Sequence, residues 1–173
     1  MKKVTGLNSD EYVPYQKMYL DLVEEVGAIE QLKTSLSELE TFFNTLPDEK
    51  LNFTYAKGKW TIKELLLHII DTERIFQYRA LRFAREDKTE LPGFSENEYV
   101  AAVDVSKRTL TSLLNEYRVV RLSTISLFET FSNEELLRIG IASGFTTSVR
   151  AIAYLLIGHQ RHHINIIKKR YLI

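Results

Sequence analysis

Hydrophobic residues recur at steps of three and four along four stretches of the chain, a spacing typical of helices that bury one face. In the first stretch they are Ile29, Leu32, Leu36, Leu39, Phe43 and Leu46. The four stretches lie within residues 29–46, 60–85, 110–131 and 147–171. The pattern predicts four long helices and therefore an all-α fold, a single four-helix bundle.

Helix-start signals support this division. Thr61 followed by Glu64 forms a capping box at the start of the second long helix, where Trp60 and Leu65 occupy the positions of a hydrophobic staple. Similar boxes at residues 95–98 and 132–135 predict two short extra helices, the first of them leading into the third long helix. The other boundaries are a helix end at Pro47-Asp48, a turn from Gly140 to Gly144, and a cap on the last helix by Thr147 or Ser148.

Residues 1–27 precede the first long helix. They predict a short amphipathic helix between Glu11 and Leu22, with Pro14 in its first turn because proline is tolerated only there. Three tyrosines of this segment are expected to pack their rings against the edge of the core, and a ring-lined ligand pocket is the alternative. They are Tyr12, Tyr15 and Tyr19.

The composition changes this picture little. A chain of 173 residues, 45% hydrophobic and 27% charged, suits one soluble domain over residues 1–173. A formal net charge of +0 argues against a nucleic-acid or anionic-membrane partner, and the lack of cysteine excludes disulfides and thiolate ligands. The N-terminal residues contain no apolar signal core, and no apolar run approaches a membrane span, so we expect a cytoplasmic protein.

The histidines carry the candidate chemistry. The chain has four, three of them between Gly158 and His163. On a helix, His159 and His163 stack one turn apart at about 6 Å, which suits one metal ion. At about 100° per residue, His163 lies nearest the apolar stripe, His159 on its shoulder and His162 farthest toward solvent. We therefore pair His159 with His163 and leave His162 out.

His68 can join this pair if the second and fourth long helices are antiparallel. It lies about 10 Å from the start of its helix at 1.5 Å per residue, and His163 lies at a similar height from the end of the last helix. The polar link from Glu86 to Ser95 is long enough to return the chain across the bundle, which makes the second and third helices parallel. The alternative is that the histidines are merely half-buried and satisfied by backbone or carboxylate groups.

Three neutral imidazoles leave a tetrahedral metal one open position, as in catalytic zinc sites, and nickel or iron also accepts imidazole. Asp71, one turn after His68, is a candidate to orient the His68 ring, although it can equally be a solvated carboxylate. Arg74 and Arg161 can meet an anionic substrate, but surface arginines are common. The motifs of zincins, di-iron bundles, serine hydrolases and phosphate-binding loops are absent.

The chain resembles the DinB superfamily, in particular its YfiT-like branch of metal-dependent enzymes. The matching segments are Lys59-Trp60-Thr61-Ile62-Lys63-Glu64-Leu65-Leu66-Leu67-His68-Ile69-Ile70-Asp71-Thr72-Glu73-Arg74, Leu91-Pro92-Gly93-Phe94 and Ile157-Gly158-His159-Gln160-Arg161-His162-His163. The resemblance implies a four-helix bundle with up-down-down-up connectivity and a metal held by His68, His159 and His163. It also implies a small-molecule substrate. Because members are often homodimers, it is compatible with a homodimer as well.

Members of this family include transferases and isomerases that use low-molecular-weight thiols such as bacillithiol or mycothiol. The leading hypothesis is therefore a metal-dependent enzyme, with zinc or nickel, that transfers such a thiol to an electrophile, since coordination lowers the pKa of a thiol. One alternative is a hydrolase that uses a metal-activated water. The other is a non-catalytic metal-binding or dimeric interaction protein.

Overall fold

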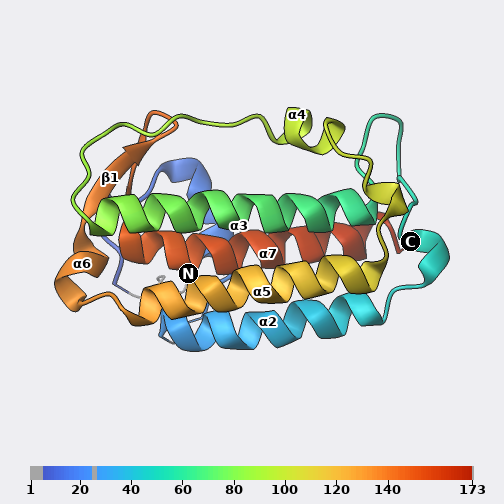
Figure 1. Ribbon diagram of the computed structural model, residues 1–173, viewed down its shortest axis with the longest axis horizontal. Helices are drawn as coiled ribbons and strands as arrows, with labels where there is room; N and C mark the ends of the chain where they lie inside the picture. Colours follow the sequence, from blue (N-terminus) through green and yellow to red (C-terminus); the bar gives the residue numbers. More distant parts are fainter. Residues whose placement is uncertain (1–5, 25–26, 173) are drawn as a thin grey trace.

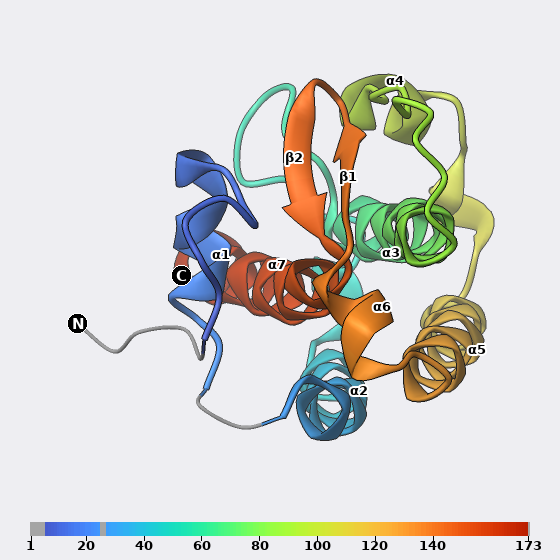
Figure 2. The same cartoon turned by 90° about the vertical axis from the view of Figure 1, so that its left-hand side faces the viewer.

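Four long helices form the body of the protein in a computed structural model that describes residues 6–24 and 27–172. They are α2 (Ala28–Asn44), α3 (Ile62–Ala84), α5 (Leu110–Glu129) and α7 (Val149–Arg170). Helix α3 packs between α5 and α7, and α2 closes the bundle on the opposite side (Figures 1 and 2). Helices α2 and α7 point one way and α3 and α5 the other, so the predicted up-down-down-up connectivity is confirmed (Figure 1). No helix in the described ranges is both long and apolar enough to cross a membrane.

The predicted helix starts agree with the structure. Thr61 accepts a hydrogen bond from the Glu64 N–H at 3.2 Å, and the Glu64 carboxylate accepts one from the Thr61 N–H at 2.6 Å. Of the two candidate caps of α7, Ser148 accepts from the Ala151 N–H at 3.1 Å. The short helices are α4 (Glu96–Ala101) and α6 (Asn133–Leu137), and a 3-10 turn, η3 (Val105–Lys107), separates α4 from α5. Another 3-10 turn, η2 (Asp48–Lys50), follows α2.

The segment predicted to be only a turn is a β-hairpin. Strands β1 (Ile139–Ala142) and β2 (Phe145–Ser148) pair antiparallel, and the turn itself is limited to Ser143 and Gly144. Both turn residues have positive φ, 55° and 76°, as a two-residue type I′ turn requires. The sequence prediction was wrong because it treated Gly140 as a turn residue. A Cβ on Gly140 would lie 2.0 Å from the Phe83 ring, so this glycine instead lets β1 press against α3.

The N-terminal segment is less helical than predicted. Pro14 opens a 3-10 turn, η1 (Pro14–Gln16), and only α1 (Lys17–Leu20) follows it. Helix α1 lies against α7, and it can approach closely because the residue facing the Tyr19 carbonyl is Gly158. Within the predicted lead-in, residues 1–5, 25 and 26 lie outside the described residues.

A buried polar layer divides the hydrophobic core into two clusters, one toward each end of the bundle. Its centre is Arg121, which is 0% exposed and donates from Nε and Nη2 to the Glu73 carboxylate at 2.7 and 2.8 Å. Arg121 also donates to the Ser35 hydroxyl, and the Gln160 side-chain amide donates to the Ser35 carbonyl at 2.7 Å. The layer therefore joins all four long helices at one level.

Candidate metal centre

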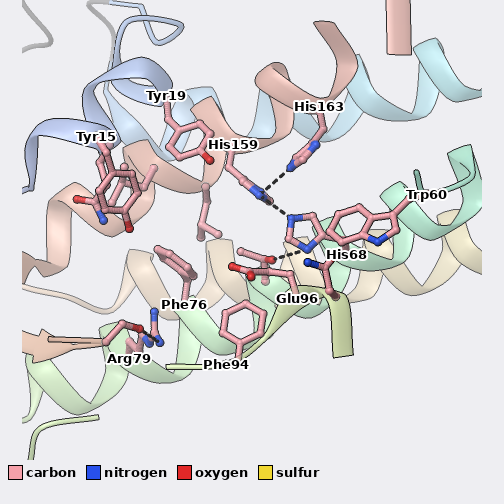
Figure 3. A pocket seen from close by; sticks show the side chains of 16 residues that line it. Tyr15, Tyr19, Trp60, His68, Phe76, Arg79, Phe94, Glu96, His159 and His163 are labelled. Atoms are coloured by element: carbon pink, nitrogen blue, oxygen red, sulfur yellow. Dashed lines mark hydrogen bonds between the residues drawn. The ribbon is translucent and has the colours of Figure 1, made fainter. Parts of the chain in front are cut away.

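Three imidazoles from two antiparallel helices converge. His68 comes from α3, and His159 and His163 come from successive turns of α7. The Nε2 atom of His159 lies 3.0 Å from Nε2 of His68 and 3.0 Å from Nε2 of His163 (Figure 3). One ring nitrogen from each residue lies within 4.8 Å of the others. The structure thus brings together the three residues that the sequence singled out.

The spacing of these nitrogens suits a single ion. Two imidazole nitrogens bound at about 2.0–2.1 Å to one tetrahedral metal lie roughly 3.3 Å apart. The two distances of 3.0 Å therefore need only a small outward movement of the rings. Among the described residues, this is the group of three or more His, Asp or Glu side chains with such a geometry.

The electrostatic environment keeps the three rings neutral. Burial lowers the pKa of His68 to about 4, although the charge of Glu96 opposes this effect. Burial, and then the neighbouring histidines, lower the pKa of His163 to about 3. The pKa of His159 is lowered well below its usual value by burial and by the other histidines around it. Because neutral imidazole is the form that binds metals, the site needs no deprotonation near neutral pH.

His162 takes no part in this cluster. Its ring is half-buried and meets the edge of the Tyr19 ring, with 5.2 Å between ring centroids. The helix phase explains the difference, since residue 162 is turned away from the side of α7 that faces α3.

Of the two alternatives for Asp71, the hydrogen bond to the His68 ring is not formed. The closest polar partner of the His68 Nδ1 atom is the Thr72 hydroxyl at 3.5 Å, because residue i+4 stacks more directly over residue i than residue i+3 does. Asp71 instead lies 3.8 Å from Nη1 of Arg74. The Nδ1 atom of His163 is buried and has no hydrogen-bond partner in the described part of the chain, so no hydrogen bond orients the ring from that side.

A pocket of about 310 Å³ opens beside the cluster (Figure 3). Aromatic side chains form part of its wall, and the Trp60 ring lies 4.9 Å from the His68 ring, centroid to centroid. Trp60 thus lines the pocket in addition to its position at the start of α3. Two of the tyrosines expected to pack on the core edge also face this space. The aromatic side chains of the wall are Tyr15, Tyr19, Trp60, Phe76 and Phe94.

Two charged residues of the pocket, Arg79 and Glu96, were missed by the sequence analysis. Arg74 and Arg161, the two arginines singled out from the sequence, do not line this pocket. Arg74 pairs with Glu116 at 2.6 Å and Arg161 bonds to Glu38 at 3.0 Å. A usable signal existed for Arg79, because it follows His68 by eleven residues, which is three helical turns and brings it to the same face of α3. For Glu96, at the start of α4, the sequence offered no such signal.

Comparison with known proteins gives three findings. Residues 31–167 match the sequence profile described as "DinB superfamily". A protein of Oceanobacillus iheyensis named "putative metal-dependent hydrolase" is 29% identical over 163 residues, covering 84% of this chain and 88% of the relative. A protein of the same name from Geobacillus thermodenitrificans is 24% identical over 152 residues, covering 87% and 84%.

The fold also has a solved counterpart. The structure of YfiT from Bacillus subtilis superposes with a TM-score of 0.72 and 16% identity, covering 98% of this chain and 90% of YfiT. It is described as "a probable metal-dependent hydrolase with an unusual four-helix bundle topology". At this identity the match establishes the shared bundle, and the up-down-down-up order seen here agrees with it.

Proposed function

Because the chain belongs to the DinB superfamily, we propose that it is a metal-dependent hydrolase whose divalent ion is held by His68, His159 and His163. The observation that carries the proposal is the convergence of three neutral, largely buried imidazoles at one end of a pocket. The names of the relatives support the same class of reaction. We propose zinc or nickel as the ion, since both accept three imidazole ligands.

A divalent metal held by three imidazoles supplies a Lewis acid and lowers the pKa of a coordinated water toward neutrality. The chain's own residues must then hold the substrate and move protons. Apolar walls formed by Phe76, Phe94, Leu155 and Leu156 exclude water from the space beside the cluster and hold the uncharged part of a substrate.

We assign the proton-transfer role to Glu96. It is the acidic residue among those lining the pocket, and its charge acts on His68. Hydrolysis needs a group that takes a proton from the attacking water and returns it to the leaving group. Within the described residues the Glu96 carboxylate forms no ion pair or side-chain hydrogen bond, so both of its oxygens are available to a water or a substrate; Figure 3 shows it in the pocket beside His68.

The experiment is a metal-dependence assay on a panel of esters and amides. The protein is stripped with a chelator, reloaded separately with zinc and with nickel, and assayed for turnover. We expect activity to return with metal, and Glu96→Gln to lower kcat by about 10²-fold or more while the metal content stays unchanged. Glu98→Gln, a change to a neighbouring exposed carboxylate of α4, is the matched control. Absence of turnover in the reloaded protein would count against a hydrolase and favour a non-catalytic metal-binding or dimeric interaction protein.

Transfer of a low-molecular-weight thiol is the second candidate, because a thiol can occupy the same coordination position as water and the chain itself has no cysteine. The same assay separates the two reactions. A hydrolase turns over without added thiol, whereas a transferase consumes an electrophile only when a thiol is present.

A further inference from the structure

The cation of Arg79 is buried in the pocket, where the charge of Glu96 acts on it without a direct ion pair among the described residues. Its side chain is 6% exposed, and Nη2 donates to the Pro92 carbonyl at 3.0 Å and to the Ser143 hydroxyl at 2.9 Å. Both acceptors are neutral, and Arg79 forms no ion pair with any described carboxylate. Burial lowers its pKa, and the charge of Glu96 opposes this effect only in part. A buried charge of this kind is costly unless it is paired.

Only one of the three guanidinium nitrogens of Arg79 donates hydrogen bonds within the described residues. Both hydrogen bonds leave from Nη2, so the N–H groups on Nη1 and Nε have no partner among the described residues. These atoms are not sealed in the protein interior, and Arg79 lines the pocket. The N–H groups on Nη1 and on Nε lie on different edges of the guanidinium, and each can donate a single charge-assisted hydrogen bond to an anion such as a carboxylate.

Arg79 lies at the opposite end of the pocket from the imidazoles. The two residues stand on the same face of α3, and about 16 Å of helix separates His68 from Arg79 at 1.5 Å per residue. Phe76 and Phe94 lie between these ends (Figure 3). The pocket is therefore polar at both ends and apolar in the middle.

We propose that the substrate is an elongated molecule with a carboxylate that pairs with Arg79, an apolar middle, and its hydrolysable group at the three imidazoles. Only the part of the inference that places the hydrolysable group at the imidazoles rests on the proposed hydrolase function. A carboxylate fits better than a phosphate monoester because the pocket has one arginine and also contains Glu96, which repels a dianion more strongly than a monoanion.

The test uses the metal-loaded protein and three probes of one shape: 4-phenylbutyrate, its neutral amide, and 4-phenylbutyl phosphate. Trp60 is the only tryptophan and lines the pocket, so its fluorescence reports binding. We expect the acid to bind wild-type protein about tenfold or more tightly than the amide, and Arg79→Gln to remove that preference. Arg74→Gln, on the same helix but paired with Glu116 outside the pocket, should change neither affinity.

Several results would overturn the inference. One is equal affinity of the wild-type protein for acid and amide, which needs no variant and shows that Arg79 only ties the loop at Pro92 to the hairpin. Others are tighter binding of the phosphate, or no saturable binding of the acid at millimolar concentration. Loss of acid binding in His159→Ala but not in Arg79→Gln would mean that the acid coordinates the metal.

Failure of the hydrolase proposal looks different. A protein that holds no metal but still binds 4-phenylbutyrate through Arg79 would disprove the hydrolase and keep the acid site. Metal-dependent turnover without any preference for acidic probes would support the hydrolase and disprove the acid site.

Discussion

His68 and His159 are 91 positions apart in the chain, and their Nε2 atoms lie 3.0 Å apart. They meet because α3 and α7 are antiparallel and are aligned so that the second turn of α3 faces the middle of α7 (Figure 1). The contact is thus a direct measure of the relative position of the two helices along the bundle axis. Features that set that position also determine whether the three imidazoles can share one ion.

The metal-binding role of the cluster can be tested by removing one ring at a time. We expect His68→Ala, His159→Ala and His163→Ala each to lose stoichiometric metal, because two imidazoles bind a divalent ion far more weakly than three. His162→Ala is the matched control, since this ring lies outside the cluster. Elemental analysis after dialysis gives the result, and metal retained by both His159→Ala and His163→Ala would rule out the site.

The partner of the His68 ring is a separate prediction. Thr72→Val removes the hydroxyl that lies 3.5 Å from Nδ1 and should weaken metal binding by about 10-fold or more, because groups that orient a ligand ring affect affinity to this extent. Asp71→Asn should leave the affinity unchanged. Competition with a chromogenic chelator measures both, and the opposite ranking would restore Asp71 as the orienting group.

Much of the bundle and the histidine cluster followed from helical periodicity. The spacing of His159 and His163 is local, and the height of His68 depends only on counting residues from a recognisable capping box. Antiparallel packing of α3 and α7 could be inferred from the length of one polar link. Features that depend on a single regular helix could therefore be predicted from the sequence.

The rest of the site depends on contacts between irregular segments. Arg79 acquires its role because the loop at Pro92 and the hairpin turn at Ser143 come together over it, through hydrogen bonds between Leu91 and both Ile141 and Ser143. Sequence periodicity contains no information on such contacts. The hairpin itself was missed because its strands are only four residues long, and the role of Gly140 is visible only against the Phe83 ring.

Close packing of α1 against α7 gives a further prediction. A Cβ on Gly158 would lie 2.1 Å from the Tyr19 carbonyl oxygen, which is backbone and cannot move aside cheaply. Gly158→Ala should therefore displace α1, expose the pocket beside His159 and increase hydrogen exchange in residues 14–20. Metal content should persist, since the ligands lie on α3 and α7. Gly144→Ala is the comparison variant. No atom lies within 4 Å of a Cβ added there, so any effect comes from the strain of a positive φ and not from a steric clash. Unchanged exchange in Gly158→Ala would show that α1 does not need this contact.

Glu11 should make stability depend on pH in the acid range. Burial raises the pKa of its carboxyl, but hydrogen bonds from Arg150, the Asn8 N–H and Ser148 lower it by more. The net effect is to lower the pKa from 4.5 to about 2. The carboxylate is thus stabilised in the folded state. Its contribution is complete above about pH 5 and is lost as the pH falls through about 2.

Chemical denaturation at several pH values measures this effect. Glu11→Gln should lower the free energy of unfolding at pH 7 by about 2 kcal/mol, and the difference from wild type should shrink toward pH 2. Glu49→Gln, at an exposed position, should behave as wild type. A difference that stays constant between pH 7 and pH 2 would exclude a linked ionisation of Glu11.

The polar layer around Arg121 links stability to the metal site. Arg121→Met leaves the Glu73 carboxylate, 1% exposed, buried without its partner and should cost about 3–5 kcal/mol of unfolding free energy. Arg118→Met breaks an exposed ion pair with Glu40 and should cost less than about 1 kcal/mol. Urea denaturation compares the two variants directly.

The double variant Arg121→Met/Glu73→Met separates stability from alignment. Replacing both charges by apolar side chains should recover most of the lost stability, since buried ion pairs often contribute little net energy. It removes the charged pair that links α3 to α5 and, through Ser35 and Gln160, to α7, one residue from His159. We therefore expect a stable protein with weakened metal binding. A double variant that is stable and binds metal as wild type does would show that apolar packing alone aligns α3 with α7.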